Sequence, residues 1–250
     1  MKVSVIIPTF NRAHTIPYAI KSLLLQREDI DLDILVVDDG SSDETPKVLA
    51  ELAQAHTEIR VVTQKNAGVA AARNTGILNL LPDTALVSFL DSDDLSPAGR
   101  FAADVSCFVT DPTLEATYGR LMMVSEFDYA RLRPAKDARI ADIIGVHLSS
   151  AIFSQSLIRR IGKFDTDFIQ AEDTDYLLRV FETKTKFLQT ETPCLYYLRH
   201  PGGMTKDVAE SKRYFSLAIR KSILRRKADP TIRIVKPDFD VKALQATGFF

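Results

Sequence analysis

The sequence lacks the features that mark several large classes of protein. It has only two cysteines, Cys107 and Cys194, which lie far apart and form no metal-ligand spacing. Two cysteines in 250 residues make no disulfide framework, so the composition favours a reducing, cytoplasmic compartment. No stretch approaches the roughly 18 apolar residues of a membrane span, and no signal-like segment precedes the first apolar run. The net charge of -1 gives no indication of a nucleic-acid-binding protein.

Two glycine-rich phosphate-binding motifs are also absent. The sequence contains neither G-x-G-x-x-G nor G-x-x-x-x-G-K-S/T, which argues against a dinucleotide-binding fingerprint and against a P-loop. What it does contain is 46% hydrophobic and 26% charged residues, the profile of an ordinary globular protein. With 250 residues the chain can bury a good core, as one domain or as two closely packed halves.

Four short apolar runs alternate with amphipathic segments in the first part of the chain. The amphipathic segments carry apolar residues at helical spacing, as Ile16, Ile20 and Leu23 show. The apolar runs are residues 3–7, 34–37, 59–63 and 86–90. This alternation predicts an α/β fold with a mostly parallel, Rossmann-like open sheet and helices on both of its faces.

Polar side chains follow each of these runs. In such sheets ligands bind outside the carboxyl ends of the strands, so this edge is the expected site. The densest group is Asp91, Asp93 and Asp94. Ionised carboxylates are costly to bury unpaired, so we expect either a divalent cation with a phosphorylated ligand or a solvated acidic turn that caps the next helix. The other polar residues after the runs are Thr9, Arg12, Asp38, Asp39 and Lys65.

Four motifs follow one another along the first half of the chain. They are Val5-Ile6-Ile7-Pro8-Thr9-Phe10-Asn11-Arg12, Val36-Val37-Asp38-Asp39-Gly40-Ser41-Ser42-Asp43, Asn66-Ala67-Gly68 with Ala72-Arg73-Asn74, and Leu90-Asp91-Ser92-Asp93-Asp94. In this order and spacing they resemble the inverting family 2 glycosyltransferases of the GT-A fold. The resemblance implies a nucleotide-diphosphate sugar donor, usually a UDP-sugar, and a saccharide or glycolipid acceptor.

The resemblance also implies roles for single residues. Thr9 would lie against the nucleoside, Asp39 would bond the base, and Arg73 would approach the diphosphate. Asp91 would lie near the ribose, and Asp93 would ligate Mn²⁺ or Mg²⁺. The implied donor-binding set is Thr9, Asn11, Arg12, Asp39, Lys65, Arg73, Asp91, Ser92 and Thr205.

Simpler explanations stay open for several of these residues. Asp39 could only stabilise the turn before Gly40, and Arg73 could only pair with a neighbouring carboxylate. Asp94 could serve only to start the helix behind it. The residues by themselves do not choose between these explanations and a ligand contact.

The second half extends the resemblance. A Gly162-Lys163-Phe164-Asp165 turn precedes the pair Glu172-Asp173, which opens a segment with helical apolar spacing. Inverting transfer needs a carboxylate that takes the proton of the acceptor hydroxyl. The resemblance implies that Asp173 is this base and that Glu172 holds the acceptor or Asp173 in position. Alternatively, acidic residues simply favour the first turn of a helix, as Asp175 also would.

The segment from Tyr196 to Thr205 completes the resemblance. It is similar to the Tyr-Arg-x-His segment of many family members, in which the histidine meets the metal or the diphosphate. Here His200 follows Arg199 directly, where the family commonly has one residue between them, so the role of Arg199 is open. The resemblance implies His200 as a second metal ligand and Thr205 as a residue that closes over the donor.

Further expectations concern the architecture. Ser96 and Pro97 predict the cap and first residue of a helix, residues 149–153 a strand, and the charged residues 128–139 an exposed loop that could cover the acceptor or be inert. A basic segment from 209 to 227 predicts a helix that could contact an anionic membrane surface or present a solvated face. His147 is assigned no role.

The sequence therefore predicts three regions and one activity. Residues 1–95 form a nucleotide-sugar-binding half, 96–205 an acceptor-binding half of the same domain, and 206–250 a C-terminal helical extension. The activity is an inverting, metal-assisted glycosyl transfer by a cytoplasmic enzyme, with peripheral membrane contact as an open addition. A sugar nucleotidyltransferase is the first alternative, although Pro8 to Arg12 lacks its expected glycine-rich loop. A non-catalytic nucleotide- or carbohydrate-binding module is the second.

Overall fold

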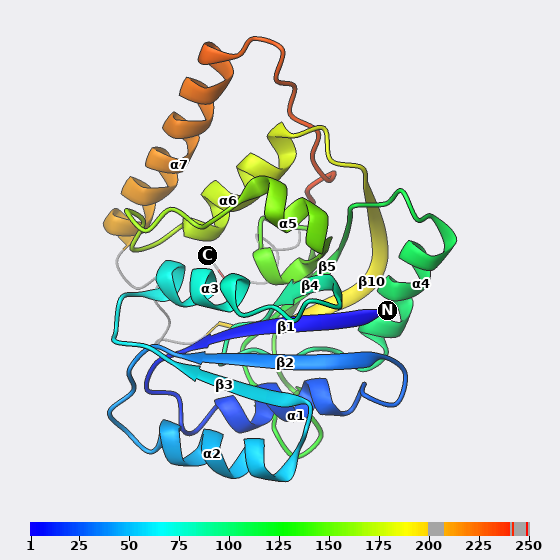
Figure 1. The fold of residues 1–250 in the computed structure, drawn as a ribbon, viewed down its shortest axis with the longest axis vertical. Helices are drawn as coiled ribbons and strands as arrows, with labels where there is room; N and C mark the ends of the chain where they lie inside the picture. The colour runs from blue at the N-terminus through cyan, green and yellow to red at the C-terminus, as the bar shows by residue number, and fades with distance from the viewer. Residues whose placement is uncertain (200–207, 241, 243–248, 250) are drawn as a thin grey trace.

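The computed structural model describes residues 1–199, 208–240, 242 and 249, and these form a central sheet with helices on both faces (Figure 1). The strands of the sheet are β1 (Lys2–Thr9), β2 (Asp31–Asp38), β3 (Ile59–Thr63), β4 (Thr84–Phe89), β5 (Ala116–Val124), β8 (Ile140–Ile143), β9 (Ala151–Ser154) and β10 (Phe187–Leu198). The helices are α1 (Ile16–Leu24), α2 (Thr45–Ala55), α3 (Val69–Leu78), α4 (Arg100–Thr110), α5 (Gln155–Ile161), α6 (Glu172–Glu182) and α7 (Val208–Ala228).

The sheet is mixed but mostly parallel, as the sequence predicts. Its strand order is β10-β5-β9-β4-β1-β2-β3, with β8 paired to β5. The pairs β1–β2, β1–β4, β2–β3 and β5–β10 are parallel. The strand β9 is antiparallel to both β4 and β5, and β8 is antiparallel to β5. Consequently β1, β2, β4 and β5 all end at the same edge of the sheet.

Alternating side chains of each buried strand divide the core into two layers. On β1, Val5 packs in one layer with α1, α2 and α4, whereas Ile6 packs in the other with α3, α5 and α6. In Figure 1, α1 and α2 lie below the sheet, and α3, α5 and α6 lie above it. Every face of the inner strands is therefore covered, which explains why their sequences are continuously apolar.

The start of α4 differs from the sequence-based prediction. Ser96 is not its cap, because the helix begins at Arg100 after Gly99, whose φ is +77°. Instead the backbone N–H of Ser96 donates to Ser22 Oγ at 3.0 Å, and its hydroxyl accepts from Gln26 Nε2 at 3.0 Å. Ser96 thus ties its loop to α1, and Asp94 lies too far upstream to start α4.

Strand β10 was not predicted, and it includes a proline. Because β10 is at the edge of the sheet, Pro193 can lie opposite Arg120 of β5, where the pairing register shifts. The strand predicted at residues 149–153 is observed as β9, preceded by a 3-10 helix at Leu148–Ser150. The predicted loop 128–139 contains part of a short hairpin of β6 (Phe127–Asp128) and β7 (Arg133–Pro134).

The basic helix α7 packs against α6. Lys221 Nζ contacts Asp165 at 2.5 Å, and Arg225 contacts Asp175 at 3.0 Å and Glu182 at 2.6 Å. Part of its positive charge therefore pairs within the molecule rather than facing solvent. No helix among the described residues is both long and apolar enough to cross a bilayer.

Candidate active site

A cavity of about 860 Å³ opens at the carboxyl edge of the sheet, where the sequence predicts the site. Segments from both halves of the chain line it, including the ends of β1, β2 and β4 and the first turn of α6. The sequence-predicted residues that line it are Thr9, Arg12, Asp39, Arg73, Asp91, Ser92, Asp93, Glu172 and Asp173.

The acidic residues after β4 form a tight turn, closed by a 3.1 Å hydrogen bond from the Asp94 backbone N–H to the Asp91 carbonyl. Asp94 is buried, and its Oδ1 accepts from the Leu198 backbone N–H at 2.9 Å. Its Oδ2 is also buried and has no hydrogen-bond partner among the described residues. Burial, with the charges of Asp93 and Asp91, raises the pKa of Asp94 well above its usual range. Oδ2 is therefore the oxygen with which Asp94, once it loses its proton, could bind a cation.

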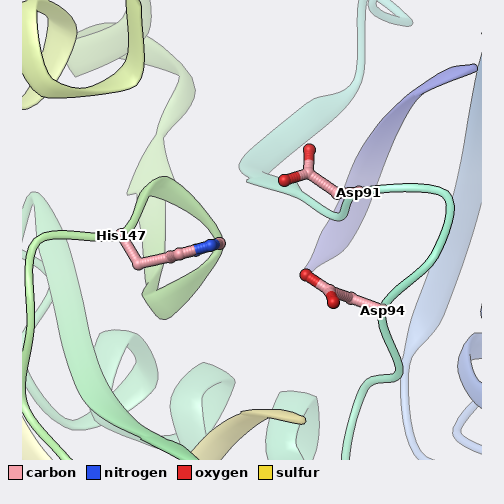
Figure 2. A group of neighbouring side chains, drawn as sticks. All are labelled: Asp91, Asp94 and His147. Atoms are coloured by element: carbon pink, nitrogen blue, oxygen red, sulfur yellow. The ribbon is translucent and has the colours of Figure 1, made fainter. Parts of the chain in front are cut away.

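His147 joins this turn from the other side of the cavity (Figure 2). One ligand atom each of Asp91, Asp94 and His147 lies within 4.8 Å of the others, a set of oxygen and nitrogen donors that could hold a divalent metal. However, Nδ1 of His147 accepts a 3.3 Å hydrogen bond from the Ser149 backbone N–H, so the neutral ring carries its proton on Nε2. To bind a metal, His147 would have to lose either the hydrogen bond at Nδ1 or the proton on Nε2. The carboxylates are therefore the better ligands.

Arg73 links the two halves of the site. It lies on α3, it is buried, and its guanidinium donates to Asp91 Oδ1 at 2.8 Å and to Glu172 Oε1. Burial alone would lower the pKa of Arg73, but the charges of Asp91 and Glu172 outweigh it and raise the pKa. Its Nε has no partner within the described part of the chain. Arg73 is thus a buried cation that two carboxylates hold in place.

The adjacent acids Glu172 and Asp173 have different environments. Ala171, in the left-handed region at φ +59°, precedes them and begins α6. Glu172 is buried; this burial and the charge of Asp173, opposed by Arg73, raise its pKa to about 7. Asp173 is half-buried in the cavity wall, and its Oδ1 accepts from the Thr174 backbone N–H at 2.6 Å. Asp173 is therefore the more accessible carboxylate for an incoming hydroxyl.

Asp39 organises the opposite wall. Its Oδ1 accepts from Gln64 Nε2 at 2.7 Å and from the Ala67 backbone N–H at 2.9 Å, and its Oδ2 accepts from the Gly68 backbone N–H at 2.8 Å. It thus holds the loop before α3 rather than the turn before Gly40. A carboxylate accepts about four hydrogen bonds, so one position remains for a ligand. Nearby, the buried Thr9 hydroxyl has no partner among the described residues.

The remaining predicted residues separate into two groups. Ser92 and Arg12 line the cavity, and Arg12 Nε lies 3.6 Å from Asp93 Oδ2. Asn11 and Lys65 are not among the described residues that line the cavity. Asn11 Oδ1 instead accepts from the Ser42 backbone N–H at 2.8 Å, and Lys65 is exposed. Their roles as donor ligands stay predictions, and His200 and Thr205 lie outside the described residues.

Among the cavity residues to which the sequence analysis gives no role are His147 and Tyr197. Their rings lie 5.0 Å apart between centroids, and both line the cavity. His147 precedes a 3-10 turn whose neighbours carry no recognisable motif, so no local signal identifies it. Tyr197 lies within β10, and recognising that strand would have placed it at the same edge.

Comparison with solved structures agrees with this architecture. TarS 1-349 of S. aureus, solved in complex with UDP-GlcNAc, gives a TM-score of 0.71 at 18% identity over 90% of this chain and 66% of that chain. The mannosyltransferase PcManGT from Pyrobaculum calidifontis, in complex with GDP-Man and Mn²⁺, gives a TM-score of 0.66 at 22% identity over 89% of this chain and 64% of that one. At these identities the likeness shows the GT-A fold alone.

Sequence comparison identifies the family. EpsJ of Bacillus subtilis, an uncharacterized glycosyltransferase, is 26% identical over 227 residues, which cover 82% of this chain and 63% of that protein. An uncharacterized glycosyltransferase of Rickettsia felis is 45% identical over 94 residues, 38% of this chain and 15% of that protein. The chain thus spans less than two thirds of either relative. Because residues 4–133, more than half of the chain, match the family described as Glycosyl transferase family 2, the chain belongs to that family.

Proposed function

We propose that the protein is an inverting glycosyltransferase that moves a sugar from a nucleotide-diphosphate sugar, usually a UDP-sugar, to a hydroxyl of a saccharide or glycolipid acceptor. One observation carries this proposal: a single cavity combines the half-buried carboxylate of Asp173 with the fixed guanidinium of Arg73. Membership of family 2 supports the reaction class. A structure of TarS in complex with UDP supports a uridine nucleotide as donor.

The proposed proton transfer uses one of two neighbouring carboxylates. Asp173 takes the proton of the acceptor hydroxyl as that oxygen attacks the anomeric carbon, with the nucleoside diphosphate leaving on the opposite side. Glu172 is the poorer candidate for the base, because it is buried and accepts a hydrogen bond from Arg73. Arg73 stabilises the charge that develops on the departing diphosphate, and Asp39 and Thr9 bind the nucleoside. Residues 1–95 would then bind the donor and residues 96–205 the acceptor.

The residues after β4 fit a divalent cation, Mn²⁺ or Mg²⁺. The unpartnered Oδ2 of buried Asp94 and the nearby carboxylate of Asp91 supply oxygen ligands, and Asp93 lies on the same turn. Asp93 remains the ligand that the sequence predicts, together with His200. When bound, such a cation would neutralise charge on the diphosphate. His147 would orient the carboxylates by donating its Nε2–H.

Replacing Asp173 by Asn tests the assignment of the base. We expect turnover to fall by about 10²–10⁴-fold, since the amide cannot accept the proton, while UDP affinity stays unchanged. Asp167→Asn, at an exposed carboxylate before α6, serves as the matched control and should retain turnover. Loss of UDP affinity with unchanged turnover at saturation would show that Asp173 binds the donor instead.

The cation assignment is tested by calorimetric titration of Mn²⁺ into the UDP-bound protein. We expect Asp93→Asn and Asp94→Asn each to weaken Mn²⁺ binding by at least about tenfold, because each removes one anionic ligand. The control is Asp83→Asn, whose side chain lies at the start of β4, at the opposite edge of the sheet. Unchanged Mn²⁺ affinity in both turn variants would place the cation elsewhere.

Contact with a membrane is a further part of the proposal. On α7 the large side chains of Phe215, Ile223 and Leu224 are exposed among arginines and lysines, and Phe215 also lines the cavity. A helix with this composition can lie on an anionic bilayer at the cytoplasmic face. Sedimentation with vesicles containing about 30% phosphatidylserine should bring down the protein, and Leu224→Glu should abolish this. Equal binding to neutral vesicles would contradict the electrostatic part.

A further inference from the structure

A second cavity, of about 500 Å³, lies under the β6–β7 hairpin, outside the candidate active site. Its lining combines apolar and basic side chains. The apolar side chains include Met122 of β5, Tyr196 of β10 and Ile140 of β8, and the basic ones are Arg131, Arg133 and Lys136. Concave sites with apolar walls and a few charged groups are typical of small-ligand binding.

The lining has an excess of positive charge that no described residue compensates. Arg131 pairs with Asp128 at 2.8 Å, and Asp128 is the carboxylate among the lining residues. Arg133 and Lys136 form no ion pair with any residue that the structure describes, and both are exposed. Exposed single cations are common, but here two share one concave site with an aromatic ring. That combination favours an anion that also has an apolar surface.

The two cavities share the same two strands. On β5, Met122 lines the second cavity and Met123 lines the candidate active site; on β10, Tyr196 and Tyr197 divide in the same way. Because neighbouring side chains of a strand point to opposite faces, the cavities lie on either side of β5 and β10 near their carboxyl ends. A saccharide chain that leaves the active site around this edge would reach the hairpin.

We propose that the second cavity binds an anionic sugar unit of the acceptor, one that carries a carboxylate or a phosphate. The apolar face of the sugar ring lies on Tyr196 and Met122, and the anion meets Arg133 and Lys136. The proposal rests on the proposed function and names the class of acceptor. Of the two alternatives that the sequence leaves open for residues 128–139, covering the acceptor or being inert, the proposal favours the first.

The test uses the whole protein saturated with UDP and Mg²⁺, so that small anions cannot occupy the donor site. Glucose, glucuronic acid and glucose 6-phosphate are titrated separately, and their affinities are measured by ligand-observed NMR. The two anionic sugars distinguish a carboxylate from a phosphate at equal ring structure. The test variant is a double variant that combines Arg133→Gln with Lys136→Gln. The control variant is Arg159→Gln, at an exposed arginine of α5 that lines neither cavity.

We expect at least one anionic sugar to bind about tenfold or more tightly than glucose. In the double variant this advantage should disappear, while the control retains it and both variants bind UDP as the wild type does. Raising the salt concentration should weaken the anionic sugars only. Equal affinity for all three sugars, or equal loss in the control variant, would overturn the proposal while leaving the glycosyltransferase function intact. Failure of every form to bind UDP would contradict the proposed function instead.

Discussion

The raised pKa of Glu172 predicts a specific dependence of stability on pH. In the folded protein its pKa rises from an ordinary value of 4.5 to about 7, because the carboxyl is buried, although Arg73 acts in the opposite direction. Between these values the folded chain binds a proton that the unfolded chain releases. Stability must therefore fall as the pH rises through this window. In the Glu172→Gln variant the side chain does not titrate, so this contribution should vanish.

The size of the effect follows from the same two pKa values. A rise from 4.5 to about 7 corresponds to about 3 kcal/mol, at 1.36 kcal/mol per pKa unit. Urea unfolding between pH 4 and pH 8 measures the free energy of unfolding of the wild type and the variant. We expect the difference between wild type and variant to change by about this amount, with the wild type losing stability relative to Glu172→Gln as the pH rises.

A matched control removes the effects of other titrating groups. Glu51→Gln makes the same substitution at an exposed site on α2, and its curve should stay parallel to that of the wild type. If Glu172→Gln also runs parallel to the wild type, the reasoning is refuted. In that case the hydrogen bond from Arg73 would keep Glu172 ionised in the folded state at every pH tested.

Two further predictions concern stability, one through packing and one through a buried ion pair. A Cβ at Gly76 would lie 2.4 Å from Ile6 Cγ2, so Gly76→Ala should lower the free energy of unfolding by about 1–3 kcal/mol. In an Ile6→Ala background the same substitution should cost nothing, because the contacting atoms are gone. Equal costs in both backgrounds would contradict the close approach of α3 to β1. Arg225→Met leaves Asp175 and Glu182 buried with fewer partners, so urea unfolding should show a loss of about 2–4 kcal/mol. Arg220→Met, at an exposed residue of the same helix, should change stability by less than about 0.5 kcal/mol; similar losses in both would refute the ion-pair argument.

The first half of the fold, in which strands and helices alternate, is predicted well from the sequence, because apolar runs and helical spacing are local patterns. Each of the four apolar runs becomes a parallel strand, and the polar residues after them meet at one edge. The boundaries are less well predicted: β2 starts at Asp31, three residues before the predicted run. Asp33 is buried in this strand, where Arg60 contacts it at 2.7 Å and Ser4 donates to it at 2.6 Å. Those partners are distant in sequence, so no local pattern reveals that Asp33 can be buried.

The same limit explains what was missed in the candidate site. The carboxylates after β4 and the Glu172-Asp173 pair were identified because each forms a compact motif. His147 and the free oxygen of Asp94 depend instead on how β5, β9 and β10 bring separate segments together. For Arg73 the sequence predicts either a pair with one carboxylate or a contact to the diphosphate. The structure shows pairs with two carboxylates, which come from segments far apart in the chain.

The two ion pairs of Arg73 connect donor binding and catalysis in the proposed reaction. Arg73 holds Asp91, on the donor side of the cavity, and Glu172, in the first turn of α6. The two carboxylates are 81 residues apart in the chain, so the guanidinium is a direct link between the two halves. A diphosphate that approaches Arg73 competes with both carboxylates for the same charge. Any shift of Glu172 then moves the backbone that carries Asp173, so the proposed base is positioned by the residue that is proposed to meet the donor.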